Sequence, residues 1–324
     1  MKILNGFEPS SIEKAVKMLK QGNIVAFPTE TVYGLGADAL DPYAVTKIFE
    51  AKKRPKFDPL IVHIGEKNWI SSITDDVPAE AEKLIDRFWP GPLTLILKKK
   101  DAIPGIVTAG LSTVAIRMPS HPVALQLIKS FESPIAAPSA NPFGYVSPTS
   151  ALHVAKMLGE DVPLILDGGN SNYGLESTII SFNEGKIYLH RHGAISSEEL
   201  SEIAGTIREK EKNNLCEAPG ELPYHYAPMK PLKIIHNTGE IKNIRSSFLA
   251  FREPSEKPIS KYFKVLSIQG DMREAAANFF SCLIELDKED IDVIYAENIE
   301  EKGLGKAMMD RLKKASKKYI HITH

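Results

Sequence analysis

Short apolar runs alternate with segments of helical periodicity over the first two thirds of the chain. Runs of strand type lie at residues 24–27, 60–64, 93–97, 114–118, 135–137 and 164–166. Apolar residues at helical spacing, behind capping residues or proline, predict helices that begin after Ser10 or Ser11 and at Pro42, Pro122, Ala151 and Ser197. Residues 177–182 and 186–190 predict a hairpin. This alternation predicts an α/β fold.

The pattern changes after residue 208. Residues 208–214 are polar, and residues 218–228 contain three prolines, so residues 211–231 are predicted to form an extended linker between a first domain, 1–210, and a second, 232–324. The second domain is a small α/β unit. Its predicted strands are 232–236, 247–251, 262–266, 292–296 and 319–323, and its predicted helices are 271–286 and 304–315.

Length and charge agree with two soluble domains. Single cores stop growing near ~250–300 residues, and the chain has 324 residues, 43% apolar and 25% charged. The formal net charge of −1 argues against a protein that grips a nucleic-acid backbone over a wide surface. Two cysteines, no signal-peptide pattern and no run of ~20 apolar residues predict a cytoplasmic protein without a membrane span.

Polar residues gather where the predicted strands of the first domain end, which is where open α/β sheets bind ligands. The stretches are 28–36, 52–55, His63, 113–119, 137–142 with 147–149, 167–169, 176–178 and Arg191. Thr113, Ala115 and Arg117 share one face of their strand. Together these residues supply several cations and hydroxyls, as a phosphate-handling pocket requires.

Taken singly, each stretch also has a structural explanation. Lys52 and Arg54 lie at a predicted helix C-terminus, where the helix dipole stabilises cations. His63 suits a hydrogen-bonded core position, and Arg117 suits a buried salt bridge. Ser139 and Asn141 suit turns. Neither a Walker loop, a kinase motif set nor a Ser–His–Asp arrangement is present, so the chemistry is predicted to be positional and electrostatic.

Six separated motifs make the chain resemble the threonylcarbamoyl-AMP synthase family in its longer, two-domain form. The motifs are Pro28-Thr29-Glu30-Thr31-Val32-Tyr33-Gly34-Leu35, Lys52 with Arg54, Pro59-Leu60-Ile61-Val62-His63, Trp89-Pro90-Gly91-Pro92-Leu93-Thr94, Thr113-Val114-Ala115-Ile116-Arg117-Met118-Pro119, and Ser139 with Asn141. The linker sequence His225-Tyr226-Ala227-Pro228 extends the resemblance to nearly the whole chain.

The resemblance implies a large, open, twisted α/β domain of the YrdC type with a basic cavity, followed by a smaller Rossmann-like domain. It also implies a reaction in which L-threonine, bicarbonate and ATP form threonylcarbamoyl-AMP and pyrophosphate. Mg²⁺ accompanies ATP, and no metal ligand from the protein is assigned. A downstream threonylcarbamoyl transferase then modifies tRNA, and a weak direct tRNA contact stays open.

The resemblance further implies the site residues, with Lys52 and Arg54 as the catalytic pair. The ATP side is expected to consist of Lys52, Arg54, Asp58, Thr113, Ser139, Asn141, Ser147, Arg191 and His225. The threonine side is expected to consist of Thr31, His63, Arg117, the Ala137 backbone and Ser177. Asp58 stands where many relatives are expected to carry Asn.

The linker resembles a lid over the site mouth, with His225 directed at the nucleotide. Leu222-Pro223-Tyr224 departs from the Lys-Tyr-Arg expected before this histidine, so two cationic contacts are missing. A lid is useful because carbamates and mixed anhydrides hydrolyse readily in water. The second domain is expected to anchor this lid.

Three other functions compete with the synthase hypothesis. An RNA-binding protein would use the basic runs 98–100 and 311–318, although a solvated surface explains such runs more simply. A carbamoyl-transfer enzyme would carry zinc-finger and acylphosphatase-like segments, which are missing here. A ligand sensor would retain the pocket without the chemistry.

Overall fold

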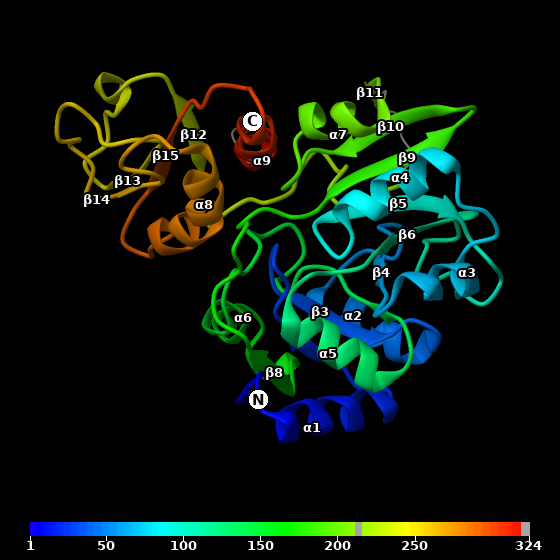
Figure 1. The fold of residues 1–324 in the computed structure, drawn as a ribbon. Coiled ribbons are helices and arrows are strands. Elements are labelled where there is room, and N and C mark those ends of the chain that lie inside the picture. The colour runs from blue at the N-terminus through cyan, green and yellow to red at the C-terminus, as the bar shows by residue number, and fades with distance from the viewer. Residues whose placement is uncertain (211–215, 319–324) are drawn as a thin grey trace.

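The computed structural model describes residues 1–210 and 216–318, which form two α/β units, each built on its own sheet. Figure 1 shows the larger unit, from blue to green, and the smaller unit, from yellow to red, with the linker crossing between them. The predicted fold class is confirmed: a large mixed sheet is followed by a small parallel sheet. The strand predicted at 319–323 lies outside the described residues.

The large sheet has the strand order β1-β8-β2-β3-β7-β4-β6-β5-β9-β10-β11. The strands are β1 Lys2–Asn5, β2 Val25–Phe27, β3 Gly34–Asp38, β4 Ile61–His63, β5 Leu93–Lys98, β6 Thr113–Arg117, β7 Ile135–Ala136, β8 Leu164–Asp167, β9 Thr178–Asn183, β10 Lys186–Arg191 and β11 Ile207–Glu209. The predicted hairpin is the antiparallel pair β9 and β10. The neighbouring strands β4 and β6 run parallel and pair His63 with Arg117, so both side chains stand at one edge of the sheet.

The helices of this unit are α1 Pro9–Lys20, α2 Pro42–Lys52, α3 Ile70–Ile73, α4 Ala79–Phe88, α5 Pro122–Phe131, α6 Ala151–Leu158 and α7 Ser197–Ala204. α2 begins as predicted, because the Asp41 carboxylate caps the N–H of Tyr43 and Pro42 occupies the first turn. Its apolar stripe of Val45, Ile48 and Phe49 is buried in the main core. The helix therefore delivers Lys52, its last residue, to the edge of the sheet.

The segment after β2 differs from the sequence prediction in one respect. Residues 28–36 were expected to form a polar loop between a strand and a helix, but Gly34 already begins β3, which pairs antiparallel with β2. A Cβ at Gly36 would lie 2.6 Å from the ring of Phe27, so the two strands approach closely only because this residue is glycine. The turn that can present side chains is thus confined to residues 28–33.

The small unit carries a four-stranded, all-parallel sheet of order β12-β15-β13-β14. Its elements are β12 Leu232–Ile235, β13 Ser246–Ala250, β14 Tyr262–Val265, α8 Met272–Leu286, β15 Val293–Glu297 and α9 Leu304–Lys317. Phe279 and Phe280 of α8 pack with Leu312 of α9 in one apolar cluster. That cluster also contains Tyr226 of the linker, so the linker packs into the core of the small unit.

Phe279→Ala should destabilise the small unit strongly. The Phe279 ring is 0% exposed, and truncation of a buried phenylalanine costs about 3–5 kcal/mol in transfer free energy and cavity formation. Urea unfolding followed by circular dichroism measures the change. Ile244→Ala, at a side chain that is 72% exposed, is the matched control and should shift the free energy of unfolding by less than about 0.5 kcal/mol. Equal unfolding midpoints for the two variants would contradict this assignment of the core.

Candidate functional site

A small cavity of about 50 Å³ lies at the edge of the large sheet where β4 and β6 end. It is lined by Thr29, Thr31, Val32, Gly34, Arg54, Ile61, His63, Arg117, Ala137, Pro138, Ser139, Glu176, Ser177, Arg191, Pro219, Gly220, His225 and Tyr226. All five residues predicted for the threonine side belong to this set. Of the residues predicted for the ATP side, Arg54, Ser139, Arg191 and His225 line it directly.

Arg117 organises one wall of the cavity. Its guanidinium forms an ion pair of 2.6 Å with the Glu30 carboxylate and donates hydrogen bonds to Thr31 Oγ1 at 2.9 Å and the Gly91 carbonyl at 3.2 Å. Arg117 is 3% exposed and Glu30 is also 3% exposed, so the two charges compensate each other out of contact with water. The structural explanation of Arg117 is therefore confirmed, and its paired side chain also lines the cavity.

His63 stands beside Arg117 and carries no charge at neutral pH. Burial and the nearby Arg117 guanidinium lower the pKa of His63 to about 3. Its ring meets the Phe27 ring edge-on at 6.3 Å, and Nδ1 has no hydrogen-bond partner among the described residues. A neutral imidazole accepts a hydrogen bond at one nitrogen and donates one at the other.

The remaining threonine-side groups are Ala137 and Ser177. The Ala137 N–H donates to the Ile61 carbonyl at 2.9 Å, so only its carbonyl is free to face a ligand. Ser177 Oγ lies 2.7 Å from Thr94 Oγ1 and accepts from Arg191 at 3.1 Å. These groups are held by the sheet rather than by flexible loops.

On the nucleotide side, Arg54 is buried against Asp58. Its Nη2 lies 2.9 Å from Asp58 Oδ1, and the guanidinium also donates to the carbonyls of Asp58 and Pro59. Burial acts to raise the pKa of Asp58 above its usual range, although Arg54 and Lys52 oppose it. Cys216 of the linker donates to the same carboxylate at 3.7 Å, so Asp58 links the catalytic-side arginine to the linker.

Lys52 lies behind the cavity rather than in its lining. Its ammonium donates to the carbonyls of Ser139, at 2.6 Å, and Asn141. Burial, followed by the adjacent Arg54 charge, lowers the pKa of Lys52 well below its usual range. The Asn141 amide nitrogen donates to the Pro142 and Tyr145 carbonyls, both at 2.9 Å. Lys52 and Asn141 therefore shape the loop that carries Ser139.

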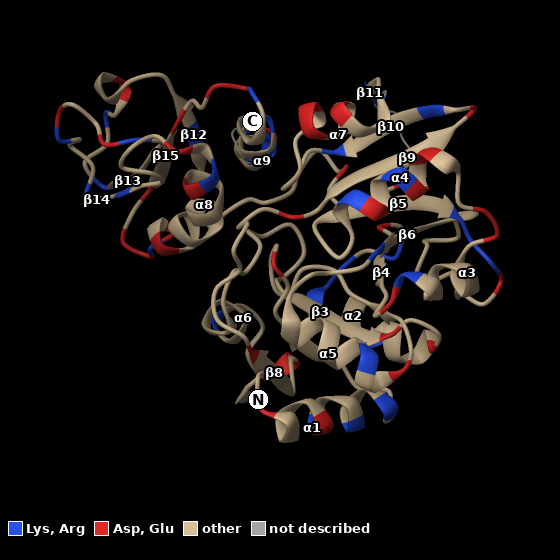
Figure 2. Cartoon of the chain, viewed as in Figure 1, with Lys and Arg blue, Asp and Glu red and all other residues tan. Residues whose placement is uncertain are grey.

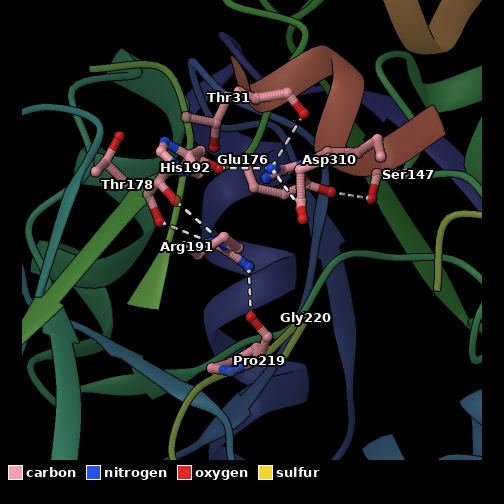
Figure 3. A network of polar contacts seen from close by, with 12 residues as sticks. Thr31, Ser147, Glu176, Thr178, Arg191, His192, Pro219, Gly220 and Asp310 are labelled. Atoms are coloured by element: carbon pink, nitrogen blue, oxygen red, sulfur yellow. Dashed lines mark hydrogen bonds and ion pairs between the residues drawn. The ribbon is translucent and has the colours of Figure 1, made fainter. Parts of the chain in front are cut away.

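Ser147 and Arg191 belong to a polar network around Glu176 (Figure 3). Ser147 Oγ donates to Glu176 Oε1 at 2.6 Å, and Arg311 of α9 donates to Glu176 Oε2. Arg191 donates to the Ser177 carbonyl at 3.0 Å and to the Pro219 carbonyl of the linker at 3.1 Å. The network therefore joins the large unit, the linker and the small unit.

Thr113 is the predicted ATP-side residue that the structure leaves apart from the others. It stands at the opposite end of β6 from Arg117 and lines a separate hollow with Lys98 and Tyr188. The side chains of Thr113 and Arg117, at opposite ends of β6, lie on the same face of the sheet. Between them, Ala115 packs with Ala218 of the linker.

The linker closes the mouth of the cavity. Gly220 has φ +88°, and a Cβ there would lie 2.3 Å from the Tyr226 hydroxyl, so the linker folds back on itself at a position that requires glycine. His225 meets the Phe143 ring edge-on at 5.8 Å, and burial lowers its pKa well below the usual range, with Arg54 and Lys52 adding to the effect. The cavity that remains is far below the ~300 Å³ of ordinary ligand pockets, and four linker residues, Pro219, Gly220, His225 and Tyr226, form part of its lining.

The small unit holds the linker in this closed position. Lys314 donates to the Gly220 carbonyl at 2.8 Å, and the Arg311 guanidinium lies 4.9 Å from the centroid of the Tyr226 ring. The interpretation of residues 311–318 as a solvated basic run is therefore wrong at Arg311, which is 1% exposed. Figure 2 shows acidic and basic positions interspersed over both units.

Sequence reasoning missed four residues of the site: Glu30, Glu176, Tyr226 and Arg311. The first three lie next to predicted site residues, so proximity was an available signal. Arg311 had no local signal, since only the folded chain brings α9 to the cavity. Among residues 1–210 and 216–318, no helix is long and apolar enough to cross a membrane, and no group of three or more His, Cys, Asp or Glu side chains is placed to hold a metal ion.

Two family models match the chain. Residues 17–193 match the Sua5/YciO/YrdC model described as telomere recombination, and residues 195–317 match the model described as threonylcarbamoyl-AMP synthase, C-terminal domain. A threonylcarbamoyl-AMP synthase of Pyrococcus abyssi is 43% identical over 322 residues, which cover 95% of each chain. One of Bacillus subtilis is 42% identical over 320 residues, covering 94% of this chain and 92% of the relative.

Solved structures agree with the sequence matches. The crystal structure of P. abyssi Sua5 complexed with L-threonine has a TM-score of 0.91 at 41% identity and covers 98% of each chain. The structure of Escherichia coli YciO has a TM-score of 0.53 at 23% identity, covering 59% of this chain and 93% of YciO, which shows a shared fold for the large unit.

His63 should make the stability of the protein depend on pH on the acidic side. Its pKa is about 3 when folded and about 6.5 when unfolded, so the unfolded chain binds more protons between these values. This contribution is complete above about pH 6.5 and is lost as the pH falls, by about 1.4 kcal/mol per pH unit. Urea unfolding at pH 6.5, 5.5 and 4.5 should give a shallower pH dependence for His63→Gln than for the wild type. Parallel curves would show that His63 is not buried in its neutral form.

Proposed function

This chain belongs to the threonylcarbamoyl-AMP synthase family, and we propose that it condenses L-threonine, bicarbonate and ATP into threonylcarbamoyl-AMP and pyrophosphate. The observation that carries the proposal is the cavity whose lining brings together Arg54, which follows α2, Arg117 at the end of β6 and Arg191 at the end of β10. One of these arginines suits an amino-acid carboxylate, and the others suit a triphosphate.

The proposed reaction has two bond-forming steps. The threonine amine attacks bicarbonate, and loss of water leaves a carbamate on nitrogen. A carbamate oxygen then attacks the α-phosphorus of ATP, and the bond to the pyrophosphate leaving group breaks. The second step makes the protein a nucleotidyltransferase, whose main tasks are alignment of the reactants and compensation of developing charge.

On the threonine side, Arg117 is proposed to bind the substrate carboxylate together with the Thr31 hydroxyl. The Arg117 ion pair with Glu30 supports this role, because it fixes the guanidinium before the substrate arrives. The backbone N–H of Ala137 already donates to another carbonyl, so the Ala137 carbonyl is proposed to accept a hydrogen bond from threonine. His63 and Ser177 complete the threonine side.

On the nucleotide side, Lys52 and Arg54 are proposed as the catalytic pair, and Arg191 as a further phosphate contact. Two donors of Lys52 hold backbone carbonyls, and an ammonium has three, so Lys52 would reach a phosphate oxygen only where the triphosphate extends behind the present cavity lining. Cations placed where the pyrophosphate charge develops lower the barrier most. Ser139, Asn141, Ser147 and Thr113 are proposed to contact the rest of the nucleotide, and Asp58 to accept from it.

Mg²⁺ is proposed to arrive with ATP. The acidic side chains around the cavity are engaged with arginines, Asp58 with Arg54 and Glu176 with Arg311, which fits an ion held mainly by phosphate oxygens and water. When bound, it would neutralise charge on the leaving pyrophosphate.

The linker is proposed to act as a lid, with His225 directed at the nucleotide. Its closed position leaves little space for water around a carbamate or a mixed anhydride. We also propose that a threonylcarbamoyl transferase consumes the product to modify tRNA. Cys216 and Cys282 are free thiols, which fits the reducing cytoplasm where such chemistry on tRNA takes place.

Pyrophosphate release from ATP should require both L-threonine and bicarbonate. L-serine, which lacks the γ-methyl group, should support release roughly tenfold or more weakly, since a missing methyl is worth about 1–3 kcal/mol. Lys52→Ala and Arg54→Ala should each lower kcat/KM by about 100-fold. A coupled pyrophosphate assay, with mass spectrometry of the adenylate, measures both effects.

Lys56→Ala is the matched control, because Lys56 is an exposed cation two residues beyond Arg54; its activity should match the wild type. If ATP binds but no threonine-dependent pyrophosphate appears, the synthase proposal is wrong, and a ligand-sensing role takes its place. Salt-sensitive binding of RNA without turnover would instead favour the nucleic-acid alternative.

A further inference from the structure

Arg311 is a buried cation that the small unit delivers to the site. Its side chain is 0% exposed although it stands on α9, in the second domain. Its Nε and Nη2 donate to Glu176 Oε2 at 3.2 and 3.0 Å, and its Nη1 donates to the His192 carbonyl at 2.6 Å. The plane of its guanidinium faces Tyr226 of the linker at 4.9 Å. One side chain thus contacts two parts of the large unit and the linker.

A role limited to holding the small unit against the large one does not account for a buried arginine at this position. Met308 and Leu312, its neighbours on α9, pack by apolar contact, and apolar residues in place of a buried ion pair usually stabilise as well or better. Ala307 and Ala315 lie four residues before and after Arg311 and are each 1% exposed. These small side chains, one helical turn away on either side, leave room for the guanidinium to reach Glu176.

The effect of Arg311 passes through Glu176 to Ser147. A carboxylate accepts hydrogen bonds only, and Glu176 Oε1 takes the single hydroxyl proton of Ser147 at 2.6 Å. Ser147 is left with acceptor lone pairs alone, so its partner on a ligand must be a donor. On a nucleotide the donors are the ribose hydroxyls and the adenine amino group, not the phosphates.

We propose that Arg311 is a positioning residue of the synthase site: it holds the Glu176 carboxylate in the cavity wall so that Ser147, which is buried behind that wall, meets the nucleoside of ATP as a hydrogen-bond acceptor once the linker withdraws. This inference rests on the proposed function for the identity of the nucleotide. It makes the small domain a functional part of the ATP side rather than an appendage. It also orients Ser147 toward the ribose or the base.

The electrostatics around Glu176 agree with this role. Burial acts to raise the pKa of Glu176, but Arg311 and then Arg191 outweigh it and hold the pKa below its usual range. The groups that face Glu176 are Arg311 of α9, Arg191 of β10, the Ser147 hydroxyl and, through Arg311, Tyr226 of the linker. Removal of the Arg311 charge should raise the pKa of Glu176, because burial is then opposed mainly by Arg191 and the Ser147 hydrogen bond, and a protonated Glu176 would lose its acceptor-only character.

Steady-state kinetics of the full chain test the proposal. Arg311→Met should raise the KM for ATP by about tenfold to a hundredfold, as expected for a lost charged hydrogen-bond network, and change the KM for threonine by less than about threefold. ATP binding by this variant should strengthen as the pH rises, whereas binding by the wild type should not. Lys313→Met, at an exposed lysine on the same helix paired with Glu301, is the matched control and should behave as the wild type.

A second substitution separates positioning from folding. In Arg311→Met with Glu176→Gln, the glutamine carbonyl can accept the Ser147 proton without a counter-charge, so the KM for ATP should return toward the wild-type value. The double variant also has no unpaired buried charge, so it tests the proposal even if the single variant fails to fold. An unchanged KM for ATP in folded Arg311→Met, equal losses for both substrates, or no recovery in the double variant would overturn the positioning role.

The outcome stays distinguishable from that of the proposed function. If the wild type releases no threonine-dependent pyrophosphate, the synthase function fails, and equilibrium dialysis with labelled ATP still compares the folded variants. A tenfold weaker binding in Arg311→Met, reversed by Glu176→Gln, would then support the positioning role. Equal ATP affinities would overturn it.

Discussion

Charge that is removed from water has to be compensated, and this constraint organises the whole site. Four arginines, Arg54, Arg117, Arg191 and Arg311, are each at most 7% exposed. Three of them pair with a carboxylate: Arg54 with Asp58, Arg117 with Glu30 and Arg311 with Glu176. Each pair fixes a side chain in a single geometry, which is worth more to a binding site than the small net stability of a buried ion pair.

Arg191 is the exception to this arrangement. Within residues 1–210 and 216–318 it has no carboxylate at ion-pair distance, and its donors go to the Ser177 carbonyl and hydroxyl and the Pro219 carbonyl. Neutral acceptors compensate a guanidinium less well than an anion does. Arg191 is therefore the described arginine of this group best placed to exchange its present partners for a phosphate.

Local signals predicted most of the fold. α5 and α6 begin where predicted, because Pro122 opens the first turn of α5 and Ser150 caps α6, and regular apolar spacing follows each of them. β3 was missed because its glycines carry no strand signal; the close approach of Phe27 is what favours them. α4 was missed although Ala81, Leu84 and Ile85 are buried at helical spacing, since most of its other residues are charged. The partners of the site arginines depend on tertiary contacts: Arg311 meets Glu176 across 135 positions of sequence, a separation that no short motif spans.

The carbonyl of Pro219 has a consequence for how tightly the protein holds its nucleotide. In the proposed lid mechanism, the hydrogen bond from Arg191 to this carbonyl has to break before ATP enters, so it favours the conformation that excludes ATP. The measured dissociation constant then equals the intrinsic constant divided by the fraction of molecules whose linker is withdrawn. Two homologues with identical contacts to ATP can thus differ widely in apparent affinity through linker sequence alone. Leu222-Pro223-Tyr224 is the linker segment whose sequence would produce such a difference.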